Sequence, residues 1–170
     1  AYALQGVGTN TFIEVTTPST ELTFTQPLDD NDPGGKGLTK TGPGTLILAV
    51  APVYTGNTIV EAGVLSLTQP GFNDGSTVII DDGAKLNLDF VGSDTVTQIV
   101  LGPNAFTAPG TYNATSHPTY FSGSGSLVIP STDPFPTWIA SFTFDPGADL
   151  TKTGDPDGDG LSNFDEFAFG

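Results

Sequence analysis

A glycine-led phrase that repeats at a nearly constant interval constrains the fold of this chain more than any other feature of its sequence. Three such phrases begin at Gly44, Gly63 and Gly83, which are 19 and 20 residues apart, and each continues into a short apolar run. A related phrase begins at Gly125, 42 residues after Gly83, which is close to two further periods. One repeat of this length cannot bury its apolar face alone, so stacked repeats must share a core. The spacing therefore predicts successive turns of a solenoid, with glycine at the tight corners.

The apolar runs are short and typical of β-strands, because each is bounded by Gly, Pro, Asn or Asp. They lie at residues 22–25, 45–48, 63–67, 77–80, 86–88, 97–101 and 126–129. No stretch before residue 135 has a helical pattern. A β-sandwich is the alternative, since its strands also recur at short intervals. The likeness of the phrases to one another favours the solenoid.

Two consecutive segments carry a resemblance to a known family. Residues 37–48 (GLTKTGPGTLIL), followed by residues 54–67 (YTGNTIVEAGVLSL), resemble the autotransporter-associated β-strand repeat, and residues 76–129 resemble it more loosely. One departure is Pro52, where the family usually has Asn. The resemblance implies a secreted bacterial surface protein built on a right-handed parallel β-helix. The predicted fold class is therefore all-β: a short right-handed parallel β-solenoid of about five turns, with a small C-terminal calcium-loop segment containing one or two short helices.

Proline marks the predicted boundary between two parts of the chain. Residues 130–136 contain three prolines in seven positions, and proline at this density opposes both a strand ladder and a helix. The prediction is a β-solenoid repeat domain over 1–129, a Pro-rich linker over 130–136 and an acidic calcium-binding tail over 137–170. The apolar side chains within residues 138–142 suit one or two helical turns at the start of the tail.

The segment Asp155 to Glu166 fits a twelve-residue calcium-loop pattern, D-x-[DN]-x-[DN]-G-x5-E, at every position. Calcium prefers about six to eight oxygen ligands in a loose shell, and acids at alternate positions of a curled loop supply them. Gly160 would make the sharp turn. The predicted metal ligands are Asp155, Asp157, Asp159, the backbone carbonyl of Leu161, Asn163 (directly or through water) and Glu166. An acidic, solvated turn without an ion is the alternative, but carboxylates packed this closely repel one another unless a cation is present.

The entry to this loop differs from that of an EF-hand, because Pro146, Gly147 and Gly154 leave no room for a long incoming helix. The phrase over residues 157–168 instead resembles the calcium loops of dockerins and thrombospondin type 3 repeats. That resemblance implies a structural Ca²⁺ cofactor that orders the tail.

The charge balance excludes several classes of partner. The chain has 19 acidic residues against 4 lysines and no arginine, a net charge of -15 that repels nucleic acid and anionic membranes. No apolar run reaches the roughly 18–20 residues that cross a bilayer, so no membrane insertion is expected. There is no cysteine, and no methionine to mark a translation start, so the chain is expected to be a mature product or a piece of a longer one.

Other candidate residues have plainer interpretations. The acidic pair Asp81 and Asp82 precedes Gly83 at a repeat corner and is expected to form a turn. His117 is the only histidine and is expected in a surface loop, without partners for a catalytic triad. Aromatic side chains that could stack on sugars, but more commonly pack in cores, are Tyr54, Tyr112, Tyr120 and Phe121.

These features together predict a non-enzymatic, secreted structural or adhesive surface protein that is stabilised by calcium. Its expected location is extracellular, at the cell surface, with a glycan or cell-surface partner. Because a short solenoid has two open ends, end-to-end self-association into a filament is also expected. The alternatives are a carbohydrate-binding or spacer module of a larger secreted enzyme, and a polysaccharide lyase. The lyase is disfavoured because the lysines do not cluster with acids on one strand face.

Overall fold

The computed structural model describes residues 2–3, 10–30 and 35–169. Its Cα atoms divide into two compact units, Ala1–Pro130 and Ser131–Gly170. The first unit consists of strands, and the helices of the described residues lie in the second. Each unit has its own buried side chains and is described separately below.

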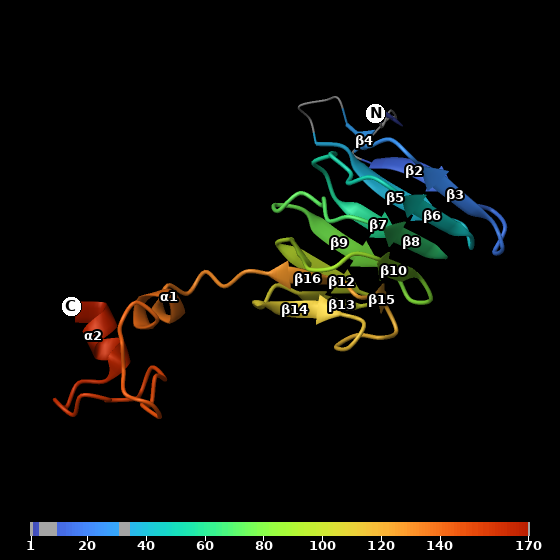
Figure 1. The fold of residues 1–170 in the computed structure, drawn as a ribbon. Coiled ribbons are helices and arrows are strands. Elements are labelled where there is room, and N and C mark those ends of the chain that lie inside the picture. Colours follow the sequence, from blue (N-terminus) through green and yellow to red (C-terminus); the bar gives the residue numbers. More distant parts are fainter. Residues whose placement is uncertain (1, 4–9, 31–34, 170) are drawn as a thin grey trace. The chain divides into compact units, whose positions relative to one another are not determined.

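Two mainly parallel sheets form the first unit (Figure 1). The first sheet contains, in spatial order, β13 (Asn104–Phe106), β12 (Gln98–Leu101), β9 (Thr77–Ile80), β7 (Thr58–Val60), β5 (Gly37–Thr41) and β2 (Asn10–Glu14). The second sheet contains β15 (Phe121–Gly123), β10 (Lys85–Leu88), β8 (Val64–Leu67), β6 (Thr45–Leu48) and β3 (Glu21–Phe24). Between β5 and β10 the chain alternates between the two sheets with every strand, so each strand pairs with the strand two places further along.

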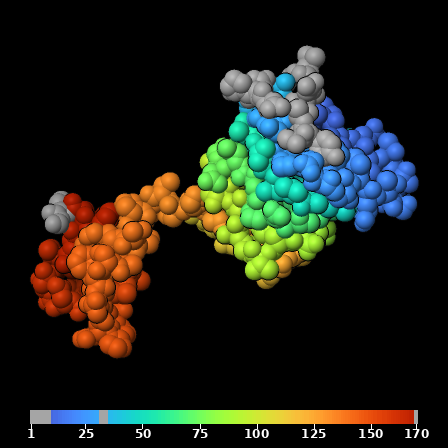
Figure 2. Space-filling view, turned by 45° about the horizontal axis from the view of Figure 1, so that its top comes forward, coloured from blue at the N-terminus to red at the C-terminus, as the bar shows by residue number. Residues whose placement is uncertain are grey.

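This alternation stacks one loop of chain on the next. Figure 2 shows the result as bands of colour that follow one another through the first unit, from blue through cyan to yellow-green. Parallel sheets built by alternating strands are compatible with the predicted β-solenoid.

A third, smaller sheet completes the unit where the repeats end. It contains β11 (Ser93–Thr95), β16 (Ser126–Ile129) and β14 (Gly110–Asn113), of which β14 is antiparallel to β16. The strand β13 is likewise antiparallel to β12. A two-stranded pair, β1 (Tyr2–Ala3) and β4 (Leu28–Asp29), lies among the N-terminal strands. Two antiparallel strands, β13 and β14, therefore interrupt the regular sequence after β12, and β15 and β16 then pair in parallel with β10 and β11.

The core consists of aligned columns of apolar side chains between the sheets. In the second sheet Leu46, Leu65 and Leu86 are directly in register, and all three are fully buried. Burying a leucine contributes about 1.5–3 kcal/mol, so the column stabilises the stack through every repeat it crosses. Leu22 of β3 continues the same column but is 38% exposed, because it lies on the last strand of its sheet. Phe121 of β15 ends the column on the other side and is buried.

The fourth glycine-led phrase does not occupy the predicted place. The strand β16, which follows Gly125, pairs with β11 and β14 in the third sheet, whereas β15 is the strand that stacks on β10. The 42-residue interval after Gly83 therefore holds one further turn of chain with β13 and β14 inserted, and two regular periods do not fit it. The sequence pattern was misleading because any short alternating strand after a corner glycine resembles the phrase.

The second unit packs two short helices around aromatic side chains. These are α1 (Phe135–Ile139) and α2 (Asn163–Phe169). The ring of Phe135 is 4% exposed and lies edge-on to that of Phe167, with 5.7 Å between centroids. Residues 135 and 136, assigned to the linker from the sequence, belong to α1. Proline is compatible with a first helical turn, because its missing N–H would have no partner there.

Within the residues that the structure describes, no helix is both long enough and apolar enough to cross a membrane.

Candidate metal centre

The acidic loop before α2 is curled by two glycines and by hydrogen bonds from its own backbone. Gly158 and Gly160 have φ of 75° and 94°, the left-handed region that side chains other than glycine disfavour. Their N–H groups donate to the two carboxylate oxygens of Asp155, at 2.9 Å and 3.1 Å respectively. The N–H of Leu161 donates to Asp159 Oδ1 at 2.8 Å. These hydrogen bonds curl the loop around the carboxylates of Asp155 and Asp159.

Three of the predicted ligands are brought together in this way. One carboxylate oxygen from each of Asp155, Asp157 and Asp159 lies within 4.8 Å of the others, and all three side chains are exposed. A calcium ion with bonds of about 2.4 Å spans oxygens up to about 4.8 Å apart, so this spacing suits a shared divalent cation. Exposure leaves the remaining coordination positions open to water or to further protein oxygens.

Glu166, on the first turn of α2, is held near this cluster. Desolvation raises the pKa of its carboxyl group, and the negative charges of Asp157, Asp159 and Asp155 raise it further. A carboxylate whose ionisation is opposed by three neighbouring anions is stabilised when a divalent cation joins the group. The pKa of Glu166 therefore responds to the same three acids that the motif groups with it.

Asn163 has a role that the sequence analysis did not foresee. Its side chain is fully buried, and Nδ2 donates to the carbonyls of Asp149 and Thr151 at 2.9 Å and 2.8 Å. Its Oδ1 is buried with no hydrogen-bond partner among the described residues. The amide therefore ties the beginning of α2 to residues 149–151, and a direct contribution to the metal would use only Oδ1.

Asp165 is the acidic residue of the segment whose role is helix capping. The Ser162 hydroxyl donates to Asp165 Oδ2 at 2.6 Å, and the Asp165 N–H donates back to Ser162 Oγ at 3.2 Å. These bonds to Ser162 lower the pKa of the Asp165 carboxyl group. The signal that predicts this contact is the capping-box spacing S-x-x-D, which reciprocally satisfies N–H groups at the start of a helix.

The acidic pair of the first unit forms the expected turn. The Ala84 N–H donates to the Asp81 carbonyl at 3.0 Å, and Gly83 has a φ of 85°. The carboxylate of Asp82 accepts the hydroxyl of Tyr120 at 2.6 Å, which raises the pKa of that phenol. The pair therefore anchors a corner.

His117 lies in an aromatic cluster. Its ring stacks on that of Tyr112 at 5.5 Å and lies edge-on to Phe106 and Phe121. Its Nδ1 is 3.0 Å from the hydroxyl of the adjacent Ser116, which is itself hydrogen-bonded within the Asn113 turn. These contacts indicate that the ring of His117 has a packing role.

The aromatic residues considered as a sugar platform are largely inside the first unit. Tyr54 is 1% exposed and its hydroxyl is 2.6 Å from Thr58 Oγ1, while Tyr112 donates to the Ala108 carbonyl. Phe121 is also buried, and Tyr120 is half-buried. Rings that face the core cannot stack on an external glycan, so Tyr54, Tyr112 and Phe121 give no support to carbohydrate binding.

One family profile matches the chain, over residues 38–67: the passenger-associated-transport-repeat. The matched segment runs from within β5 to the end of β8, so it covers the centre of both parallel sheets. No curated protein and no solved structure gives a significant match. The prediction of an autotransporter-associated repeat is confirmed for residues 38–67. This repeat is a structural element of autotransporter passengers and not a catalytic family, and it indicates a secreted or surface protein.

Proposed function

We propose that this chain is a non-enzymatic structural segment of a secreted bacterial surface protein. In this proposal the first unit is a right-handed parallel β-solenoid of about five turns, and the second is a tail stabilised by calcium. The observation that carries the proposal is the position of the matched repeat. Residues 38–67 supply four consecutive strands that alternate between the two parallel sheets, as the stacking of a passenger repeat requires.

Calcium binding to the tail is supported by the geometry of the acidic loop. Asp155, Asp157 and Asp159 converge on one point, and Glu166 approaches the same cluster from α2. The ion would use these carboxylates and the carbonyl of Leu161. Asn163 would hold the end of the loop in place through its hydrogen bonds to the carbonyls of Asp149 and Thr151. An affinity in the range of extracellular modules, about 10⁻⁴–10⁻³ M, is expected for an exposed site of this kind.

End-to-end self-association is supported by the end of the core near β2 and β3. Leu22 lies in register with the buried leucine column yet is 38% exposed, because β3 is the last strand of its sheet. Unburied core positions at the end of a repeat stack favour association with another copy. The opposite end carries the antiparallel strands β13 and β14, so the two ends differ and a head-to-tail contact would extend into a filament.

Calcium titration by calorimetry tests the metal site. The unaltered chain should bind one calcium ion, and Asp157→Asn and Glu166→Gln should each weaken binding at least tenfold. Asp145→Asn is the matched control, because this exposed acid lies outside the loop. Equal binding by all four proteins would refute the site.

Electron microscopy with calcium and with a chelator tests assembly. Filaments that Leu22→Asp abolishes would support the end contact through the leucine column. Monomers of the unaltered chain in both conditions would contradict the filament and leave a spacer or adhesion module.

A further inference from the structure

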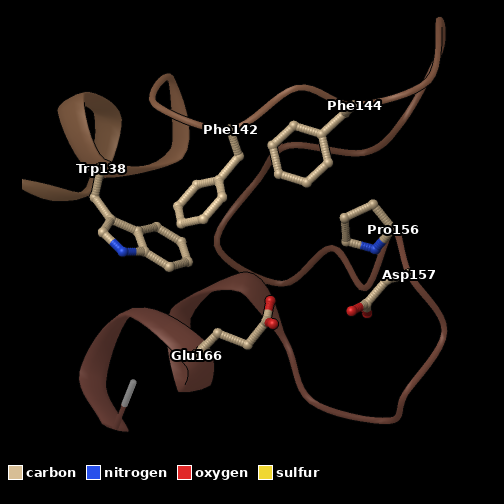
Figure 3. Close-up of a pocket in the computed structure, with 6 residues that line it drawn as sticks. All are labelled: Trp138, Phe142, Phe144, Pro156, Asp157 and Glu166. Atoms are coloured by element: carbon tan, nitrogen blue, oxygen red, sulfur yellow. The ribbon is translucent and has the colours of Figure 1, made fainter.

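A cavity of about 250 Å³ opens between aromatic residues in and after α1 and the acidic loop of the second unit. Its walls combine three aromatic rings and a proline with two carboxylates (Figure 3). The lining residues are Trp138, Phe142, Phe144, Pro156, Asp157 and Glu166. Figure 3 shows the carboxylate of Asp157 directed from the loop, and that of Glu166 directed from α2, into the space beside the rings. The cavity is therefore an aromatic half-cage with negative charge at its rim.

The aromatic walls are built by the packing of the unit itself. The rings of Trp138 and Phe142 meet edge to face with 4.9 Å between centroids, and Phe144 continues the row 6.3 Å from Phe142. Phe142 nevertheless remains 52% exposed. About half of this residue is therefore accessible to a ligand.

The rim carboxylates have no cationic partner in their own unit. Lys152 is the only basic residue between 131 and 170, and its Nζ lies 2.6 Å from Asp133 Oδ2. The same ammonium lies 5.5 Å from the ring centroid of Phe135 and 5.2 Å from that of Phe164. The unit thus already contains one ammonium group held between aromatic rings and a carboxylate. The cavity offers the same combination of groups at a second place, without a cation from its own unit.

We propose that this cavity binds a primary alkylammonium group. The ammonium would lie over the face of Phe142, where the ring quadrupole attracts it, and donate hydrogen bonds to Asp157 and Glu166. The alkyl stem would pack against Trp138, Phe144 and Pro156. A neutral ligand of the same shape would gain the packing but leave the two carboxylates unpaired, so charge is the basis of selection.

The inference does not rest on calcium binding, although it shares two side chains with the proposed metal site. A calcium ion held by Asp157 and Glu166 would neutralise the rim, and calcium and the ammonium group would then compete. Amine binding is therefore expected to be stronger in a chelator than in calcium. If calcium fails to bind, the amine should bind equally in both conditions, so failure of the metal site is distinguishable from failure of the cavity.

Trp138 is the only tryptophan of the chain, so its fluorescence reports directly on the cavity. The intact chain is titrated in a chelator with n-butylamine, and with butan-1-ol as the neutral control of similar shape. A saturable change with the amine, in the millimolar range, and none with the alcohol is expected. Equal responses to both probes would overturn the proposal.

Two matched pairs of variants locate the effect. Phe142→Leu should weaken amine binding about two- to fivefold, the size of one cation–π contact, whereas Phe164→Leu removes a similarly exposed ring elsewhere and should not. Glu166→Gln should weaken binding by a similar factor, and Asp145→Asn should not. Ligand-observed NMR of the amine repeats the titration without relying on tryptophan, and circular dichroism verifies that each variant is folded. Binding that neither Phe142→Leu nor Glu166→Gln changes would also overturn the proposal.

The ammonium group could come from a protein lysine or from a free amine. Nα-acetyl-lysine methylamide, which carries the side chain on a peptide backbone, distinguishes these sources. Binding of this compound with an affinity like that of n-butylamine would assign the cavity to lysine side chains of a partner. Binding of n-butylamine alone would assign it to free alkylamines.

Discussion

Lys40 shows how a single charged residue can stabilise the interior of this fold. Its side chain is fully buried on β5, in register with Val60 of the core, and its Nζ donates to three carbonyls. These belong to Thr41 and Gly42 of its own corner and to Ala62 of the next, at 2.8, 2.8 and 3.0 Å. Burial lowers the pKa of the lysine. The three bonds use all the donors of the ammonium group and connect two successive repeats.

We expect Lys40→Met to lower the free energy of unfolding of the first unit by about 2–4 kcal/mol, because the half-buried carbonyls of Gly42 and Ala62 lose the lysine donor. The Thr41 carbonyl loses the same donor but still accepts the N–H of Val15. Lys85→Met is the control, because Lys85 donates one solvent-exposed hydrogen bond, to the Pro118 carbonyl. This substitution should lower the free energy of unfolding by less than about 1 kcal/mol. Urea denaturation followed by far-UV circular dichroism measures both. Equal losses of unfolding free energy in the two variants would show that the hydrogen bonds of Lys40 stabilise the unit no more than the exposed bond of Lys85.

The substitution Glu166→Gln is expected to weaken calcium binding but, without calcium, to stabilise the second unit. The folded-state pKa of Glu166 is raised, so the folded unit holds its proton at pH values where the unfolded chain has lost it. Stability from this group is therefore present at acid pH and lost as the pH rises through the folded pKa. At neutral pH, without calcium, Glu166→Gln should raise the unfolding midpoint of the second unit, followed by Trp138 fluorescence. The gain should vanish at acid pH; a variant less stable than the unaltered chain at neutral pH would contradict this account.

At the scale of the elements, the corners between strands decide where the chain can turn. Gly63 and Gly83 precede β8 and β10, and both have positive φ, of 68° and 85°. Their surroundings differ. A Cβ on Gly63 would collide with the backbone carbonyl of Gly44 and lie 2.6 Å from that of Gly42, whereas a Cβ on Gly83 would meet nothing within 4 Å. The first corner therefore needs glycine for close packing as well as for conformation.

This contrast predicts two different costs for the same substitution. Gly83→Ala should destabilise the first unit by about 1–2 kcal/mol, the cost of a left-handed residue with a side chain. Gly63→Ala should cost about 1–3 kcal/mol more, because the corners of neighbouring repeats must move apart. Denaturant midpoints for the two variants, measured side by side, provide the comparison. Equal losses of stability in the two variants would show that the corner at Gly63 can move away from its neighbour without an energetic cost.

At the scale of the whole molecule, the two units have different sources of stability. The first contains aligned apolar columns that extend through both parallel sheets, whereas the second has few buried residues and a cluster of three exposed carboxylates. Calcium, if bound only by the folded acidic loop, stabilises the unit that contains this loop.

We therefore expect calcium to raise the unfolding midpoint reported by Trp138 and to leave the β-strand signal of circular dichroism unchanged. Magnesium at the same concentration is the control, because its smaller and stricter octahedral shell suits this open loop poorly. Equal shifts of both signals with calcium would show that the two units unfold as one.

Several features of the molecule were determined by the sequence alone. The seven predicted apolar runs all correspond to strands, since period-2 alternation between turn residues is a local property of the chain. The spacing of Gly44, Gly63 and Gly83 placed three strands in one sheet, because equal repeats stack in register. The motif over residues 155–166 predicted which acids would gather, and Asp155, Asp157 and Asp159 do so because their loop is short and self-contained.

Other features were decided only by the tertiary structure. Nothing local separates the strand after Gly125 from its predecessors, and only its pairing with β11 places it in another sheet. From the sequence, Lys40 would be expected on the surface. In the structure it is buried, because the carbonyls of two corners accept hydrogen bonds from its ammonium group. Asn163 fits a ligand position in the motif, yet its amide bonds residues 149–151. In each case the residues that determine the position of a strand or side chain lie in another segment of the chain, so the local sequence pattern could not predict the contact.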